Sequence, residues 1–261
     1  MGTRCCWRPS PTRSNGALYE KLNFNFIRDI APVAGIIRVP MAILAHPSIP
    51  PATVPELIAY AKANPGKINM ASAGTGSAPH LAGELFNVMA GIKLVHVPYR
   101  GQGPALGDLL GGQVQVMFAT TPGTTDYVRT GRLKGLAVTT ASRAEVLPEL
   151  PTVGEFVPGY EASQWYGVGA PKNTPAEIVD KLNKEINAAL ADPKMKARFA
   201  EIGGEVLPGS PADFGKFIAP GNREMGEGGE ICRPQAGLID LREAANGAAS
   251  DLCSVTPFTC P

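Results

Sequence analysis

Short apolar runs alternate with stretches of helical periodicity along most of this chain. Residues 30–37, 41–45 and 114–118 are mainly apolar runs of strand length. A run without polar alternation is typical of a strand that is buried on both faces. The stretches between such runs repeat apolar residues at helical spacing, as at Leu81 and Leu85. This order predicts an α/β fold in which parallel strands are joined by right-handed helical crossovers.

Local signals predict where some elements begin and end. Thr53 and Thr174 each stand three residues before a Glu, the spacing of a capping box at a helix N-terminus. Pro40 interrupts the first long apolar stretch and predicts two strands, at 30–37 and 41–45. Residues 1–16 have no periodicity and predict irregular structure.

A small, glycine-rich turn joins an apolar run at 68–71 to a helical pattern that passes through Leu81. Such a turn leaves backbone N–H groups unpaired, and the helix dipole adds positive potential, so we expect an anion site. No Lys follows as it would in a nucleotide-binding P-loop. The alternative is a tight turn that binds nothing. The turn (residues 72–77) consists of Ser72, Ala73, Gly74, Thr75, Gly76 and Ser77.

Two further loops, 98–101 and 119–122, follow predicted strands and should gather at the same sheet edge. Their candidate ligand contacts are a tyrosine, as a hydrogen-bond donor or an aromatic wall, an arginine, as a cation, and two threonines, as uncharged hydroxyls. A later strand offers the ring of a tryptophan at the point where the chain crosses back. The tyrosine, the arginine and the tryptophan each have a plainer alternative: a rim aromatic, a solvated or salt-bridged cation, and a core or hinge ring. These candidates are Tyr99, Arg100, Thr120, Thr121 and Trp165.

Composition narrows the function classes. The 261 residues are 44% hydrophobic, enough for one large or two modest domains, and the net charge of +1 gives no field for nucleic acid or anionic lipid. No apolar run is long enough to span a bilayer. All five cysteines lie in the two ends, without zinc-ligand spacing, so we expect no metal and no cofactor. A cysteine-free body also suits an oxidising compartment, although cysteine is simply a rare residue.

Several motifs occur in a specific order along the body of the chain. They include Ser-Ala-Gly-Thr-Gly-Ser-Ala-Pro-His-Leu at 72–81, Val-Pro-Tyr-Arg-Gly at 97–101, Leu-Pro-Thr-Val-Gly-Glu at 150–155 and Ala-Pro-Lys-Asn-Thr-Pro at 170–175. With these motifs, the body from about residue 18 to 218 resembles the solute-binding receptors of tripartite tricarboxylate transporters, also called the Bug (Bordetella uptake gene) family.

The resemblance implies a two-lobed type II periplasmic-binding-protein (Venus-flytrap) fold of the α/β class. Domain one would comprise 17–48 and 163–218, and domain two 49–162. It also implies a periplasmic, monomeric, non-catalytic receptor that captures a small carboxylate and delivers it to membrane permease subunits. An enzyme or a sensory ligand-binding domain on the same fold is the alternative. The absence of a nucleophile–base pair counts against the enzyme, and the absence of a helix-turn-helix counts against the regulator.

Both ends depart from the family pattern. Residues 1–16 match neither a signal peptide nor the family's N-terminal glycine-rich loop, and the tail at 219–261 lacks its closing helix. We therefore expect an N-terminally incomplete fold, a disordered C-terminal tail and weak ligand binding by the chain as written.

Overall fold

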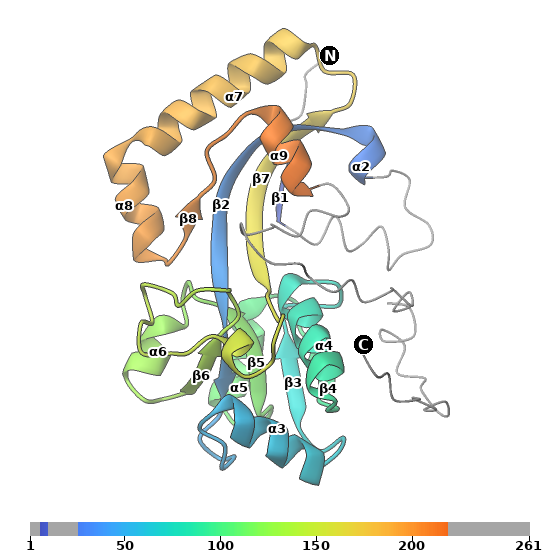
Figure 1. The fold of residues 1–261 in the computed structure, drawn as a ribbon, viewed down its shortest axis with the longest axis vertical. Helices are drawn as coiled ribbons and strands as arrows, with labels where there is room; N and C mark the ends of the chain where they lie inside the picture. Colours follow the sequence, from blue (N-terminus) through green and yellow to red (C-terminus); the bar gives the residue numbers. More distant parts are fainter. Residues whose placement is uncertain (1–5, 10–25, 219–261) are drawn as a thin grey trace, which may run out of the picture.

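The computed structural model describes residues 6–9 and 26–218. Two α/β halves are stacked along the long axis (Figure 1). The first half contains α7, α8 and α9, and the second half contains α3 to α6. The strands are β1 (Cys6–Pro9), β2 (Ile30–Ala45), β3 (Asn69–Ser72), β4 (Val95–Pro98), β5 (Val116–Thr120), β6 (Lys134–Val138), β7 (Ser163–Pro171) and β8 (Glu205–Val206). The helices are α2 (Phe26–Asp29), α3 (Val54–Ala63), α4 (Ala78–Ala90), α5 (Gln102–Leu110), α6 (Thr125–Arg129), α7 (Ala176–Ala191), α8 (Pro193–Glu201) and α9 (Pro211–Ile218), with a 3₁₀ turn at Val153–Glu155.

Strand β2 is the element common to both halves. It runs unbroken for 16 residues. Up to Pro40 it pairs with β7, in the sheet of the first half (the first sheet), and from Met41 onward it pairs with β5 and β6, in the sheet of the second half (the second sheet). The predicted break at Pro40 is wrong. Proline removes one donor but keeps an extended backbone, and here it lies where the strand changes neighbours. Register shifts after Pro32 and Gly35 take up the remaining irregularity.

The strand directions are mixed. Strand β3 lies parallel between β4 and β5, as the sequence predicts, but β2 runs antiparallel to β5, β6, β7 and β8. The prediction of wholly parallel sheets is therefore wrong, because β2 enters the second sheet from the other half rather than through a helical crossover. The expectation of irregular structure at 1–16 is also wrong for Cys6–Pro9, which pairs with β7 as β1.

The sheet register also bears on the predicted border at residue 48. Residues 41–45 pair with β5 and β6, which lie in the stretch 49–162, so this part of β2 belongs to the second sheet. The chain returns to the first sheet at Ser163, the first residue of β7. The division into two domains remains a prediction.

Helices cover both faces of the second sheet, and alternate residues of its strands point to opposite faces. Ile43 packs in a cluster with Leu57 of α3 and Phe86 of α4. Its neighbour Leu44 packs in a second cluster with Leu109 of α5. The core of this half is therefore two apolar layers separated by the sheet, which fixes the loops at its edges.

The helix caps test the local signals. Thr53 Oγ1 accepts from the Glu56 N–H at 3.3 Å, which confirms Thr53 as the N-cap. The Glu56 carboxylate accepts from the N–H of Ala52, at 2.8 Å, rather than from that of Thr53, so the capping box is only half formed. The second capping box is wrong, because α7 begins one residue later, with Pro175 as its N-cap and no side-chain bond.

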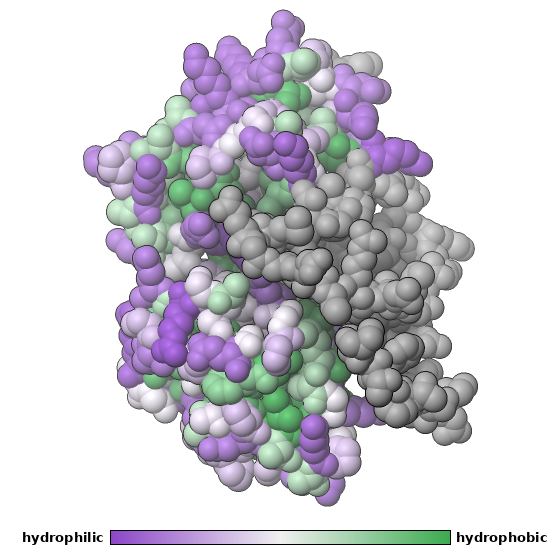
Figure 2. Space-filling model, viewed as in Figure 1, coloured by the Kyte–Doolittle hydropathy of each residue, from purple (hydrophilic) through white to green (hydrophobic). Residues whose placement is uncertain are grey.

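Hydrophilic residues predominate on the surface around α7 and α8 (Figure 2).

Within residues 6–9 and 26–218, no helix has the length and hydrophobicity needed to cross a membrane. The same residues contain no cluster of His, Cys, Asp and Glu that could hold a metal ion.

Candidate functional site

The 72–77 turn lies at the carboxyl end of β3, between the ends of two neighbouring parallel strands. Gly74 and Gly76 have φ values of 126° and 77°, which favour glycine. Ser77 is the N-cap of α4: its Oγ accepts from the His80 N–H at 3.4 Å and donates to the Gly74 carbonyl at 2.7 Å. The predicted strand, turn and helix are thus confirmed, and the turn points toward the sheet edge where ligands bind in α/β folds.

Several donors of the turn are occupied within the turn itself. The Gly74 N–H donates to Ser72 Oγ at 3.2 Å, the Ser77 N–H to the Gly74 carbonyl at 3.1 Å, and the Gly76 N–H to His80 Nδ1 at 3.1 Å. Thr75 at the tip is exposed, and its hydroxyl makes no hydrogen bond to the part of the chain that the structure describes. The turn is therefore rigidly shaped, with fewer donors left for a ligand than the sequence suggests.

Two imidazoles, one buried and one half-buried, lie behind the turn. His80 of α4 and His96 of β4 stack with ring centroids 3.8 Å apart and an interplanar angle of 25°. His96 Nε2 lies 2.6 Å from Ser72 Oγ. Burial lowers the pKa of His80, and burial together with the charge of His80 lowers the pKa of His96 to about 4. Sequence reasoning missed this pair, because its two members come from different elements.

The loop after β4 contributes one occupied and one open side chain. The Tyr99 hydroxyl donates to Asp108 Oδ2 at 2.7 Å, and burial, with this hydrogen bond, raises the pKa of Tyr99 to about 12. Its hydroxyl proton is therefore already used. Arg100 is exposed and forms no ion pair with any residue that the structure describes.

The two threonines at the end of β5 have different partners. Thr120 Oγ1 donates to Gln102 Oε1 at 2.6 Å, which ties the loop to α5. Thr121 is fully buried, and its hydroxyl donates to the carbonyl of Ile202 at 3.1 Å and to that of Pro40 at 3.4 Å. Thr121 thus connects the second sheet to the loop between α8 and β8 instead of facing an open site.

Trp165 is partly buried and packs against α9. Its ring makes edge-on contacts with Phe214 and Phe217 of α9, each at a centroid distance of 5.7 Å. These contacts place the ring under α9, within the first half of the molecule.

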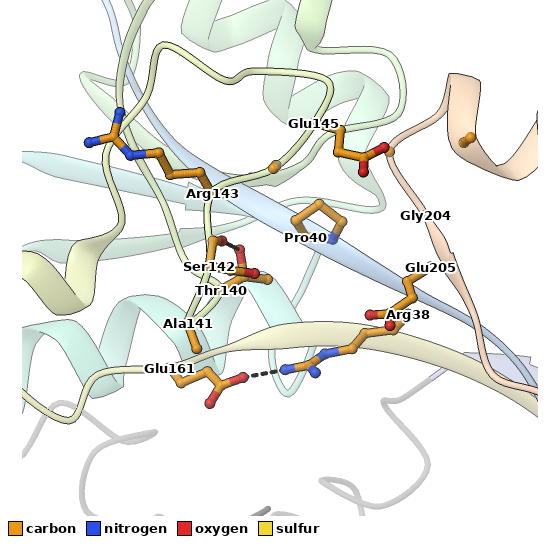
Figure 3. Close-up of a pocket in the computed structure, with 13 residues that line it drawn as sticks. Arg38, Pro40, Thr140, Ala141, Ser142, Arg143, Glu145, Glu161, Gly204 and Glu205 are labelled. Atoms are coloured by element: carbon orange, nitrogen blue, oxygen red, sulfur yellow. Dashed lines mark hydrogen bonds and ion pairs between the residues drawn. The ribbon is translucent and has the colours of Figure 1, made fainter. Parts of the chain in front are cut away.

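A cavity of about 390 Å³ lies elsewhere, between the segment 140–145 of the second half and the α8–β8 loop of the first (Figure 3). Arg38 lies at its edge, donates to Ser163 Oγ at 2.9 Å and forms an ion pair with Glu161. None of the predicted site residues lines it. Sequence reasoning missed the cavity because four separate segments form its wall without any shared motif.

Comparison with known proteins shows the family of this chain. The family model described as the tripartite tricarboxylate transporter family receptor (TctC) matches residues 9–227. An Agrobacterium vitis protein from the TAR-I ttuE-ttuC' intergenic region is 39% identical over 188 residues, which are 72% of this chain and 54% of that protein. BugT of Bordetella pertussis is 34% identical over 204 residues, 78% of this chain and 63% of BugT. The chain thus spans less than two thirds of the length of these curated relatives.

Solved structures agree in fold. An R. palustris protein with adipate superimposes with a TM-score of 0.76 at 36% identity, covering 82% of this chain and 72% of that one. The periplasmic binding protein BugD gives 0.74 at 37% identity, covering 81% and 72%. MatC from Rhodopseudomonas palustris with bound malate gives 0.72 at 30% identity, covering 80% and 72%. This chain therefore belongs to the TctC family of tripartite tricarboxylate transporter receptors, the Bug-type solute-binding proteins, and has their two-lobed α/β binding-protein fold.

Proposed function

We propose that this chain is a non-catalytic receptor that binds a small dicarboxylate at the 72–77 turn and delivers it to the membrane permease subunits of a tripartite transporter. The observation that carries the proposal is the shape of the turn: two positive-φ glycines, an exposed hydroxyl at the tip and a helix N-terminus behind it. Relatives with adipate and malate support a ligand that carries two carboxylates.

The proposed contacts divide by how free each group is. The backbone of Ala73, Gly74 and Gly76 lets a carboxylate approach closely because no bulky side chain intervenes. Thr75 supplies a free hydroxyl, and Arg100 supplies a cation from the neighbouring loop. Each hydrogen bond to a charged acceptor contributes about 1.5–3 kcal/mol, so a few of them account for the roughly 8 kcal/mol of micromolar binding.

The other predicted site residues have supporting roles in this proposal. Ser72 and Ser77 hold the turn through their internal hydrogen bonds, and Thr120 anchors the loop after β5 through Gln102. Tyr99 contributes its ring face, since its hydroxyl is bonded to Asp108. Thr121 and Trp165 contribute to the contacts between and within the two halves rather than to the ligand.

The proposed place of action is the periplasm, with the chain acting as a monomer. Family membership supports this assignment, since BugD is described as a periplasmic binding protein. Closure of the two lobes over the ligand would signal loading to the permease. Uptake of a labelled acid into vesicles that hold the permease subunits, dependent on added receptor, tests the delivery step.

Ligand binding is tested by thermal unfolding of the purified chain with adipate, malate or citrate at 1 mM, against sodium chloride of matched ionic strength. A dissociation constant of about 10 μM would give a stabilisation of about 2.7 kcal/mol at this concentration, which is a rise in Tm of several degrees. The weak binding that the departures at the two ends lead us to expect gives a smaller rise that still saturates with ligand concentration. A saturating shift with the acid recovered unchanged supports a receptor. Loss of the acid would show an enzyme, and no shift with any of the three would contradict carboxylate binding.

A further inference from the structure

The stacked imidazoles of His80 and His96 lie next to the turn without taking part in its proposed ligand contacts. His80 is 3% exposed and belongs to the first turn of α4, while His96 comes from the neighbouring strand β4. Each imidazole is connected to one glycine of the turn. Two side chains from different elements therefore support the 72–77 turn, the segment proposed to bind the carboxylate.

The bond to Gly76 fixes the protonation state of His80. Gly76 donates its N–H to His80 Nδ1 at 3.1 Å, so this nitrogen has to be unprotonated and the ring proton lies on Nε2. Nε2 faces the carboxylate of Glu84, with Oε1 at 3.8 Å. A proton added at Nδ1 would point at the Gly76 N–H and break the bond that holds this glycine at φ 77°.

His96 acts on the other glycine through a serine. Its Nε2 lies 2.6 Å from Ser72 Oγ, and Ser72 Oγ accepts from the Gly74 N–H at 3.2 Å. Ser72 is fully buried, so it has no water to replace this partner. Ser72 Oγ also donates to the Gly74 carbonyl at 3.2 Å, so the imidazole of His96 supports a side chain that bonds to both backbone groups of Gly74.

We propose that His80 and His96 are positioning residues that hold Gly76 and Gly74 in the shape that accepts a carboxylate, and that protonation of His80 weakens ligand binding. The inference rests on the proposed function of the turn.

The groups around the pair determine how readily it is protonated. Among the described residues, the titratable groups that face His80 are His96 on β4 and Glu84 on its own helix, and β3 contributes only the neutral Ser72. A proton on one imidazole therefore repels a proton on the other, and burial of His80 also disfavours its charged form, whereas the carboxylate of Glu84 attracts a proton on His80. Attraction between an imidazolium and the anionic ligand would instead strengthen binding at low pH. The sign of the pH effect on affinity therefore distinguishes the two possibilities.

The experiment compares the wild-type chain with His80→Leu and His80→Asn. Asn places an oxygen acceptor close to the position of Nδ1, whereas Leu fills similar space without an acceptor. We expect the amide hydrogen of Gly76 to exchange at least tenfold faster in His80→Leu than in the wild type, and His80→Asn to restore most of the protection. We expect the adipate affinity to fall at least tenfold in His80→Leu and to stay within about threefold in His80→Asn.

A pH series completes the test. In the wild type, the protection of the Gly76 amide, which is the intrinsic exchange rate divided by the observed rate at the same pH, should decrease as the pH falls from 7 to 4. Adipate affinity should fall in parallel. In His80→Leu both dependences should be smaller. Equal Gly76 exchange in all three proteins, or tighter adipate binding at pH 5 than at pH 7, would overturn the inference. If the wild type binds no dicarboxylate, the proposed function fails, and the Gly76 exchange rates alone still decide whether the imidazoles hold the turn.

Discussion

The hydroxyl of Thr121 donates to the backbone carbonyl of Ile202 at 3.1 Å, although 81 residues separate the two along the chain. Thr121 follows β5 in the second half, whereas Ile202 follows α8 in the first half. The same hydroxyl lies 3.4 Å from the carbonyl of Pro40, where β2 passes between the sheets. A residue that the sequence suggested for ligand contact is therefore a polar connection between the two halves.

The first prediction concerns this connection. Thr121→Val keeps the shape of the side chain but leaves the carbonyl of Ile202 without its donor, so the free energy of unfolding should fall by about 1–2 kcal/mol. Thr130→Val is the control, because the Thr130 hydroxyl bonds only within exposed α6. Its effect should stay below about 0.5 kcal/mol. Urea unfolding at pH 7 measures both, and equal losses would contradict the assigned role of Thr121.

The second prediction isolates the backbone of the turn. Gly76→Ala and Gly66→Ala each place a side chain at a similar positive φ, 77° and 70°. Both should lose about 1–2 kcal/mol of stability, because an L-residue is strained in this region. Gly66 belongs to the turn after α3, and a Cβ there would meet no other atom within 4 Å. Only Gly76→Ala should lower dicarboxylate affinity, by tenfold or more, as measured by calorimetric titration.

The third prediction uses the lowered pKa values of the histidines. The pKa of His96 falls from its ordinary value of 6.5 to about 4 in the folded chain, and that of His80 is also lowered. Between these values the unfolded chain binds protons that the folded chain does not, so stability is fully present above pH 6.5 and is lost as the pH falls toward 4. His96 alone contributes at most about 2 kcal/mol between pH 6.5 and 5. In His96→Gln the slope of stability against pH should be smaller over this range, and an unchanged slope would contradict the assignment.

The fourth prediction separates the ring of Tyr99 from its hydroxyl. Tyr99→Phe removes the bond to Asp108 and should lower stability by about 1 kcal/mol. Ligand affinity should change by less than about threefold, because the hydroxyl proton is already committed to Asp108. Arg100→Gln makes the matched comparison in the same loop: we expect it to leave stability unchanged and to reduce both the affinity and its salt dependence. A large loss of binding in Tyr99→Phe would show that the hydroxyl contacts the ligand.

The sequence was informative wherever local chemistry decides the structure. The turn between β3 and α4 was predicted because glycines and a capping serine specify a backbone shape without help from distant residues. The cap at Thr53 followed for the same reason. The family and its α/β two-lobed fold were also confirmed, because motifs in a fixed order carry information about the whole chain.

Long-range relationships were not predictable in this way. Pro40 reads locally as a strand break, yet β2 continues through it because β5, β6 and β7 supply partners on either side. The contact of His80 with His96 depends on α4 packing beside β4, which no spacing in the sequence shows. The hydrogen bonds of Tyr99 to Asp108 and of Thr121 to Ile202 likewise depend on the three-dimensional placement of the acceptor residues.

The continuity of β2 also determines an order of assembly during synthesis. Its second part pairs with β5 and β6, which leave the ribosome well before β7. Its first part has to wait for Ser163–Pro171, and pairing over such a sequence separation is slow because a long loop has to close first. The second sheet can thus form on the nascent chain while half of its longest strand still has an unpaired edge. Until β7 is made, that edge presents unpaired backbone N–H and C=O groups that another chain could pair with.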